Sequence, residues 1–457
     1  MEAATTNRQQ LGERLLRILF FTLMISVTNL SVFNVVLSNI SQEFGITSSK
    51  VSWVITGYMI FYSVGVVIYG KLADRYRLKD LLTFGIVFMA LGSIVGFVAT
   101  DYWMIVVGRM LQAIGAAVIP ATGMIIPVRY FSPENRGRAI GTAASGIALG
   151  NAVAPIISGF MTSLFGWRAL FCLSLLALLT LPFYRKYLDD ERGSLRSLDI
   201  LGGALLAGTM ALMLLSITMG SWILLVLGLI LLALFILRIR FADEPFIQPA
   251  FFRNKPYTLG ILITLFGTFI SYGILFITPQ LLANVNQISP ALIGFVMFPG
   301  AIAAALLARL GGGLADHRGD RSLFYVAALL QFISFGMLSI TAGMSPILVS
   351  ISLVFGNVGQ SFMLVAMSGK ISRSLAREQA GVGMGLFQML NFIAVAMSTT
   401  VIGKVLDYGP SLQLNALLMN PRGLAFSNIF FVLAFLVLMN VYLFYILIGK
   451  SSADSRI

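Results

Sequence analysis

Few side chains in this sequence could take part in chemistry, and most of them stand between long apolar runs rather than within them. None of the 18 aspartates and glutamates falls deep inside an apolar run, and Arg109 is the only charged residue that does. The single cysteine, Cys172, and the single histidine, His317, exclude an internal disulfide and a zinc or iron cluster. We expect no metal, no cofactor and no catalytic group. Within the apolar runs, only neutral polar side chains and the cation of Arg109 are available to interact with a ligand, chiefly by hydrogen bonds.

The apolar runs indicate a membrane protein. The 457 residues are 58% hydrophobic and 11% charged, whereas about 25% of residues are charged in soluble domains. A helix of about 20 apolar residues crosses the roughly 30 Å of hydrocarbon in a bilayer. The sequence therefore predicts an all-α protein in a lipid bilayer, with no room for a soluble catalytic domain. The fourteen predicted spans are 18–40, 51–70, 81–99, 104–127, 138–161, 166–188, 199–219, 221–240, 257–282, 289–312, 322–342, 346–368, 380–403 and 424–448.

Basic residues are distributed unevenly over the connections between these spans. If both termini lie on one side, 26 of the 31 lysines and arginines belong to that side. Only Lys50, Arg168, Lys404 and Arg422 belong to the other side. The positive-inside rule then predicts that both termini are cytoplasmic. The net charge of +13 follows from this topology and does not indicate a nucleic-acid partner.

One charged loop occurs twice. The stretch GKLADRYRLK at 70–79 recurs as GGLADHRGDR at 312–321, each time after the second span of a half. Such a repeat predicts two similar six-helix bundles with the substrate path between them. The expected domains are an N-terminal bundle (1–190), two inserted central helices (191–245) and a C-terminal bundle (246–457).

The acidic residue of each copy stands beside arginine, Asp74 next to Arg75 and Asp316 near Arg318. A carboxylate at such a position accepts hydrogen bonds from the amides of a helix N-terminus and pairs with an arginine across an interface. We expect these four residues to form a conformational latch. The alternative is an ordinary boundary loop, in which basic residues hold the cytoplasmic side and glycine makes a turn.

Three motifs carry a resemblance to a known family. The repeated loop, GRMLQAIGAA (108–117) and GTAASGIALGNAVAPIISG (141–159) resemble the loop, helix 4 and helix 5 motifs of the major facilitator superfamily. The fourteen spans, with SWVITGYMIFYSVGVVIYGKLAD and SPENRGRAIG, are similar to its 14-helix drug:proton antiporters, especially the tetracycline efflux pumps of Gram-positive bacteria. The resemblance implies the major facilitator fold, a bacterial plasma membrane, and export of drugs in exchange for protons.

Small side chains line one face of the fifth span at four-residue spacing: Thr142, Gly146, Gly150, Ala154 and Ser158. Such a stripe allows another helix to approach closely, and a proline in the span favours a kink. Static packing would explain the stripe. The family resemblance implies instead that this span bends and seals the cavity, with gating assigned to Gly141, Gly150, Pro155 and Gly159.

In the family, the arginine that matches Arg109 is linked to proton transfer. An arginine keeps its proton, so it would act through a carboxylate or a chain of water molecules. Tetracycline pumps carry acids within helices 1, 5 and 13, whereas Asn151 stands at the helix 5 position of this chain. Proton coupling would then use a boundary acid such as Asp74, Asp316 or Asp407, or a charge carried by the substrate. The alternative for Arg109 is that it extends to a membrane interface.

The expected substrate cavity is polar but uncharged. Polar groups at bilayer depth must find partners, so each candidate is either a contact between helices or a contact to a ligand. The candidates are Asn29, Asn34, Tyr58, Tyr62, Gln112, Asn151, Tyr272, Asn357, Gln360, Gln388 and Asn391.

These observations lead to a functional hypothesis. We expect a monomeric exporter of small amphipathic molecules that works by alternating access, with protons as the coupled ion and tetracycline-like drugs among the possible substrates. The alternative is a proton-independent exporter or facilitator of a neutral or anionic metabolite or lipid, in which Arg109 helps to bind the substrate. A channel or receptor does not explain the duplicated loop, and an enzyme would need a converging set of reactive groups.

Overall fold

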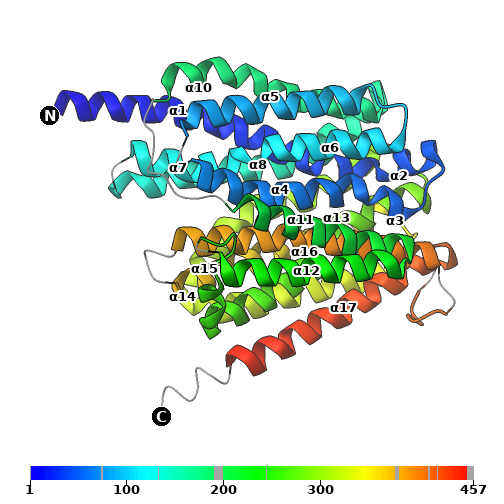
Figure 1. The fold of residues 1–457 in the computed structure, drawn as a ribbon. Coiled ribbons are helices and arrows are strands. Elements are labelled where there is room, and N and C mark those ends of the chain that lie inside the picture. The colour runs from blue at the N-terminus through cyan, green and yellow to red at the C-terminus, as the bar shows by residue number, and fades with distance from the viewer. Residues whose placement is uncertain are drawn as a thin grey trace, which may run out of the picture.

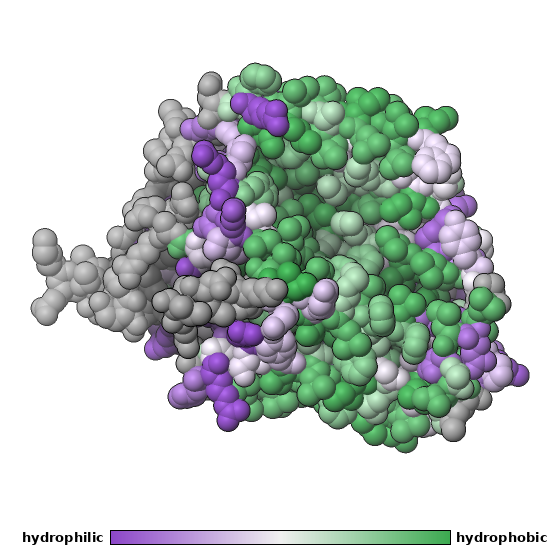
Figure 2. Space-filling view, turned by 90° about the horizontal axis from the view of Figure 1, so that it is seen from below, coloured by the Kyte–Doolittle hydropathy of each residue, from purple (hydrophilic) through white to green (hydrophobic). Residues whose placement is uncertain are grey.

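The computed structural model describes residues 2–73, 76–131, 133–189, 199–242, 244–375, 380–409, 412–418 and 420–449. Within these ranges, the side chains of 2–10, 133–137, 380–381, 448–449, Met124, Val128, Arg309 and Asp316 are left undescribed. Fourteen helical spans in the described part are long and apolar enough to cross a membrane, as the sequence predicts. A broad apolar band separates hydrophilic residues at the two ends of the molecule (Figure 2).

The first six spans form the upper half of the molecule in Figure 1. The first span combines α1 and α2, the fourth combines α6 and α7, and the sixth combines short 3₁₀ segments with α9 and α10. Their bounds are α1 (Glu2–Ser31), α2 (Phe33–Phe44), α3 (Ser48–Val51), α4 (Trp53–Leu72), α5 (Leu78–Phe97), α6 (Tyr102–Ala116), α7 (Val118–Tyr130), α8 (Pro133–Phe165), η1 (Trp167–Phe171), α9 (Cys172–Leu175), η2 (Leu176–Thr180) and α10 (Leu181–Tyr187).

The two inserted helices and the last six spans follow. In sequence order, their bounds are α11 (Ile200–Met219), α12 (Trp222–Phe241), η3 (Pro249–Arg253), α13 (Lys255–Asn284), α14 (Pro290–Thr341), α15 (Pro346–Arg373), α16 (Ala380–Tyr408), η4 (Pro421–Gly423), α17 (Leu424–Phe444) and η5 (Tyr445–Gly449). Helices α1 and α17 show that the chain starts and finishes on one side, which we call the terminal face (Figure 1). The other end is called the opposite face.

Two predicted boundaries differ from the structure. The first span extends over Leu11–Phe44, beyond the predicted 18–40, because its polar end stays helical as far as Gly45, which caps it in the left-handed conformation (φ 60°). The spans predicted at 289–312 and 322–342 are two spans in the structure as well, Pro290–Ala308 and His317–Thr341, and both lie within α14. The two helices of α14 meet at a kink at Gly319 (φ 79°), where the absence of a Cβ permits a positive φ.

The halves meet along three pairs of spans: α2 with α13, the span of α3 and α4 with α16, and α8 with α14. Helices α11 and α12 form an inserted hairpin in front of the α4–α16 seam (Figure 1), and α11 contacts both of those helices. Near the end of α11, Thr218 accepts a hydrogen bond from Trp53 of α4 (3.0 Å), and its carbonyl accepts one from Lys404 of α16 (3.1 Å). The hairpin is therefore joined to both halves, while α12 faces outward and buries only Gly228 and Phe235.

Candidate functional site

Arg109 lies inside the N-terminal half, on α6. Its side chain is 0% exposed, which excludes the alternative that it extends to a membrane interface. Nε donates to the carbonyl of Val54 (3.3 Å), and Nη1 donates to the carbonyl of Asn29 (3.2 Å) and to Oε1 of Gln112 (2.9 Å). The three-residue spacing of Arg109 and Gln112 brings the two side chains together on one face of the helix. One cation thus links α1, α4 and α6.

Aromatic rings cover the remaining faces of this guanidinium. Cζ of Arg109 lies 4.2 Å from the ring centroid of Phe33 and 4.1 Å from that of Tyr58, within the range of cation–π attraction. Tyr58 stacks on Tyr62 with 5.5 Å between centroids, and Tyr62 contacts Phe392 of α16 edge to face at 4.9 Å. A continuous aromatic path therefore runs from Arg109 to the seam between the halves.

Gln112 connects the arginine to two further helices. Nε2 donates to Ser93 of α5 and to Ser174 of α9, both at 2.9 Å, and the two hydroxyls also contact each other. All three side chains are buried. In this conformation Gln112, a predicted cavity residue, bridges helices within the N-terminal half.

Two other predicted cavity residues meet across the seam. Nδ2 of Asn34 on α2 donates to the hydroxyl of Tyr272 on α13 at 3.3 Å, and both side chains are buried. The first spans of the two halves are thus joined by a neutral pair. Asn29, one helical turn earlier along the first span, is fully buried, and its side-chain amide makes no hydrogen bond within the described residues.

Asn151 and Gln388 are exposed although they lie on helices at the centre. Asn151 on α8 accepts a hydrogen bond from the hydroxyl of Ser31 on α1 (3.0 Å). On α16, Gln388 precedes Asn391 by three residues and Phe392 by four, so it lies on the same side as both. Phe392 faces α4 and Asn391 faces α13, where it accepts a hydrogen bond from Thr268 (2.6 Å). Gln388 therefore faces the space between the halves, and that space is accessible at its level.

The remaining pair of predicted cavity residues lies on α15. Asn357 is buried against α14, where a Cβ on Gly300 would lie 2.5 Å from its Nδ2 atom. Gln360, three residues later, is partly exposed. Asn357 thus supports a close contact of two helices, whereas Gln360 keeps a polar group accessible.

The small residues of α8 allow the close approach that their spacing predicts, and the neighbour is α1. A Cβ on Gly146 would lie 2.6 Å from the carbonyl oxygen of Phe20, and one on Gly150 would lie 2.6 Å from that of Met24. A Cβ on Gly141 would meet no atom within 4 Å. The stripe is therefore a packing surface at Gly146 and Gly150, and Gly141 makes no comparable contact.

Toward the opposite face, α8 and α14 close together at backbone distance. A Cβ on Gly159 would lie 2.4 Å from the carbonyl oxygen of Pro290, and one on Gly294 would lie 2.4 Å from that of Pro155. The hydroxyl of Ser163 also accepts a hydrogen bond from the N–H of Ala291 (3.1 Å). Gly159 and Pro155, both predicted gating residues, belong to this closure. Sequence reasoning missed Gly294, which matches no quoted motif.

A second contact closes the α4–α16 seam at the same face. The N–H of Ser49, at the start of α3, donates to both carboxylate oxygens of Asp407, at 3.3 and 3.2 Å. Nearer the centre, the hydroxyl of Thr56 contacts those of Thr399 (2.8 Å) and Thr400 (3.0 Å). The sequence indicated Asp407 as one of three boundary acids that could couple protons, and nothing in it identified Ser49 as the partner.

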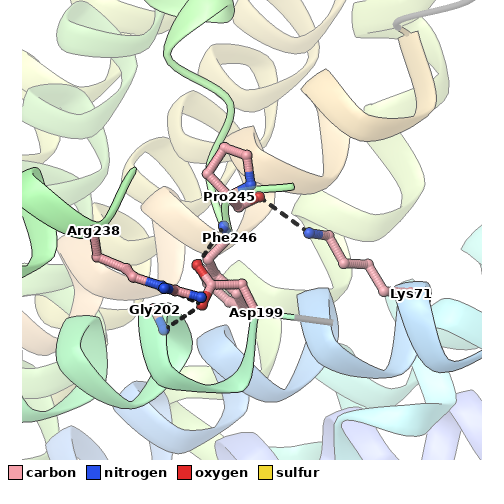
Figure 3. A network of polar contacts seen from close by, with 6 residues as sticks. All are labelled: Lys71, Asp199, Gly202, Arg238, Pro245 and Phe246. Carbon is pink, nitrogen blue, oxygen red and sulfur yellow. Dashed lines mark hydrogen bonds and ion pairs between the residues drawn. The ribbon is translucent and has the colours of Figure 1, made fainter. Parts of the chain in front are cut away.

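At the terminal face, a network holds the inserted hairpin (Figure 3). Asp199 caps α11 by accepting from the N–H of Gly202 (2.9 Å), pairs with Nε of Arg238 on α12 (3.1 Å), and accepts from the N–H of Phe246 (3.0 Å). Nζ of Lys71, which belongs to the first copy of the repeated loop, donates to the carbonyl of Pro245 (3.2 Å). The segment that leads into the C-terminal half is thus tied to both the hairpin and α4.

Burial by itself would raise the pKa of the Asp199 carboxyl, but its hydrogen bonds act in the other direction. The N–H of Gly202, the guanidinium of Arg238 and the N–H of Phe246 stabilise the ionised form, and the charge of Arg238 adds to their effect. Together they hold the pKa of Asp199 below its usual value. The network therefore contains an ionised carboxylate.

The predicted latch can be followed only in part. Asp74 and Arg75 lie outside the described residues, as does the side chain of Asp316, while Arg318 is exposed. Asp320, in the second copy, forms an ion pair with Arg373 of α15. The turns of the two copies differ, because Gly319 has φ 79° whereas the matching Arg77 is extended (φ −61°, ψ 130°) and precedes α5.

This arrangement, two six-helix halves around a central polar seam with one cation buried in the first half, defines a class of membrane transporter. The sequence profile of the Major Facilitator Superfamily matches residues 19–399. The chain belongs to this family and is a transporter rather than an enzyme.

Two curated relatives cover most of the chain. It is 26% identical over 379 residues to "Riboflavin transporter RibZ" of Clostridioides difficile (strain 630), covering 81% of this chain and 82% of that protein. It is 24% identical over 389 residues to "Multidrug resistance protein Stp" of Mycobacterium tuberculosis (strain CDC 1551 / Oshkosh), covering 82% and 72%.

Solved structures share the fold. A bacterial homolog of the human lysosomal transporter Spinster, in an inward-facing and unoccupied conformation, superposes with a TM-score of 0.70 at 14% identity, over 96% of this chain and 97% of that one. A mutant form of the nucleoside transporter NupG superposes with a TM-score of 0.67 at 13% identity, over 96% and 100%.

Proposed function

We propose that this protein exports small amphipathic molecules across a bacterial plasma membrane by alternating access, in the manner of the 14-helix drug antiporters. The observation that carries the proposal is the asymmetry of the seam. It is closed at the opposite face through Gly159 and Asp407, while Gln388 and Asn151 are accessible at the centre. Closure on one side with an accessible centre is one state of a transporter that alternates between two. A relative named for multidrug resistance supports drugs as substrates.

The orientation of this state follows from charge. The side that holds both termini carries 26 of the 31 basic residues, so we assign the terminal face to the cytoplasm. The closed contacts then face the exterior. A molecule from the cytoplasm would meet the exposed polar groups of Gln388 and Asn151 first, as export requires.

We further propose that protons enter the cycle at Asp407. Its carboxylate accepts the N–H of Ser49 across the seam, and a hydrogen bond to a charged acceptor is stronger than one to a neutral acceptor. Two lysines adjoin the contact in sequence, Lys50 after Ser49 and Lys404 one turn before Asp407. Protonation from outside would remove the negative charge and weaken the closure. External acid would thus favour the outward-open state from which a substrate leaves.

The test is transport in vesicles that contain the purified protein. Under an imposed pH gradient, uptake of tetracycline, and of ethidium as a cationic comparison, is followed together with lumenal pH. We expect proton movement to accompany drug movement and to stop in the Asp407→Asn variant. Transport that proceeds equally without a gradient would refute proton exchange. A complete lack of drug transport, in vesicles and in a pump-deficient strain, would refute drug export.

A further inference from the structure

None of the carboxylates that the structure describes pairs with the buried guanidinium of Arg109. Its hydrogen bonds go to the neutral oxygens of Val54, Asn29 and Gln112, and Nη2 makes no hydrogen bond within the described part of the chain. A buried ion is costly unless an opposite charge reaches it. Within the described residues, the positive charge of this site is therefore uncompensated.

Other buried polar atoms near Arg109 also make no hydrogen bond of good geometry within the described residues: Asn29 Nδ2 and Oδ1 and the hydroxyl of Tyr58, which lie close to one another. Oγ of Ser26 likewise makes none, and it lies close to the hydroxyl of Tyr62. The ring centroid of Tyr58 is 4.1 Å from Cζ of Arg109, and the backbone oxygen of Asn29 is 3.2 Å from Nη1. Ser26 lies three residues before Asn29, on the same face of α1. A guanidinium, an amide NH₂ and two hydroxyls are available as donors, against one amide oxygen that only accepts.

We propose that this donor cluster, Ser26, Asn29, Tyr58 and Arg109, binds an oxyanion group, a carboxylate, of the transported molecule. A carboxylate accepts several hydrogen bonds and also neutralises the guanidinium, whereas a water molecule supplies no charge. The proposal rests on the transport function above and specifies its substrate class. The sequence also favours an anionic over a cationic substrate, because no acidic residue lies deep within the spans to pair with a lipophilic cation.

The surroundings of the cluster favour an apolar body on the same ligand. Tyr62 stacks on Tyr58 and touches Phe392 across the seam, so aromatic rings lie between the donors and the space between the halves. The cluster is closed in this state, since Arg109 and Tyr58 are both 0% exposed. Separation of Tyr62 from Phe392, which rocking of the halves would produce, is the motion that would uncover it. The ligand class is an amphipathic organic anion.

The test compares two probes that share a shape and differ in charge. The full-length protein in lipid nanodiscs is titrated with 1-naphthaleneacetate and with 1-naphthaleneacetamide, and dissociation constants are measured by calorimetry. We expect the wild type to bind the carboxylate at least about tenfold more tightly. Tyr58→Phe keeps the ring over Arg109 and removes one donor, so the preference should fall severalfold. Asn29→Asp supplies an internal carboxylate and should abolish it.

Tyr184→Phe is the matched control. This tyrosine is also fully buried in the N-terminal half, and its hydroxyl contacts Thr22 (3.0 Å) away from the donor cluster. The control should keep the full preference. If Asn29→Asp does not fold, Tyr58→Phe against Tyr184→Phe still decides the question.

Several results would overturn the proposal. Equal binding of the two probes by the wild type would do so, as would a full preference in both Asn29→Asp and Tyr58→Phe. Displacement of the carboxylate by an equal concentration of inorganic phosphate would assign the cluster to a free anion instead of a substrate. A carboxylate preference in a protein that transports no amphipathic probe would contradict the proposed function and support the binding site.

Discussion

The carboxylate of Asp407 accepts a hydrogen bond from the N–H of Ser49 on the other side of the seam. We predict that Asp407→Asn, which resembles the protonated acid, opens the external side at every pH. The measurement is labelling of a Thr399→Cys variant by an impermeant maleimide, in a Cys172→Ser background. Thr399 is fully buried behind this contact. At each pH the labelling rate is divided by that of a fully exposed cysteine, because the maleimide reacts with the thiolate and labels more slowly as pH falls. The corrected rate should rise at acid pH in the wild-type context and be constant and high with Asp407→Asn.

The control for that experiment is Asp101→Asn. Asp101 is an exposed acid on the same face that precedes α6, and its side chain does not cap that helix. This variant should keep the pH dependence of labelling. A pH dependence that survives Asp407→Asn would show that another group senses the proton.

How much of the site could be predicted also differs from residue to residue. The burial of Arg109 and its contact with Gln112 could be expected, because a lone cation within an apolar run and a three-residue spacing are local features. The partners of Asp407 and Tyr62 could not. Ser49 and Phe392 are distant in sequence, and their contacts depend on how two halves come together. A single sequence contains the pattern of each helix but gives little information on which helices meet.

Within α8, two glycines predicted to act in gating have different surroundings. A Cβ on Gly159 would lie 2.4 Å from the carbonyl oxygen of Pro290, whereas one on Gly141 would meet nothing within 4 Å. Gly159→Ala should disfavour closure at the opposite face by about 1–3 kcal/mol, the usual cost of overpacking. Labelling of Thr399→Cys should therefore increase. Gly141→Ala should leave it unchanged, and equal effects of the two variants would contradict the assignment of closure to this contact.

The inserted hairpin depends on Asp199 at its base. Asp199→Ala removes the N-cap of α11, which costs about 1 kcal/mol, and also the ion pair with Arg238. The pKa of Asp199 is lowered in the fold, so its stabilising effect is present above the unfolded-state pKa and is lost as pH falls through the folded value. Thermal unfolding of the purified protein should show this loss in the wild type.

Asp199→Asn separates the two contributions. Asparagine is also a good N-cap, so this variant should keep more stability than Asp199→Ala at neutral pH. It carries no charge, so the part of the pH dependence that comes from Asp199 should disappear. An unchanged acid-induced loss of stability in Asp199→Asn would assign it to another carboxylate.

At the scale of the whole molecule, the proposed alternating access requires α8 and α14 to separate at the opposite face in every cycle. We predict that a disulfide between Ser163→Cys and Ala291→Cys, in the Cys172→Ser background, stops export and that a reductant restores it. The wild-type residues are already in contact, because the hydroxyl of Ser163 accepts the N–H of Ala291 at 3.1 Å. Drug transport in vesicles is the measurement, and each single variant is the control. Full export by the cross-linked protein would contradict the rocking mechanism.

More of the fold than of the site could be predicted from the sequence. The fourteen apolar runs and the repeated loop indicated two six-helix halves and an inserted pair, and the fourteen helical spans confirm the fold class. The stripe on α8 predicted a close helix contact without naming α1 as the neighbour. Helix ends were less predictable, because polar residues continue several helices past the apolar run and only a capping residue such as Gly45 ends them.

The inserted hairpin also gives the molecule two different sides when viewed from the lipid. On one side, α11 contacts α4 and α16, so a wall of two helices stands between acyl chains and that seam. On the α8–α14 side, the paired rings of Phe160 and Phe295 are 45% and 50% exposed. A hydrophobic compound that diffuses laterally within the membrane therefore meets a shielded seam on one side and an aromatic surface at the other.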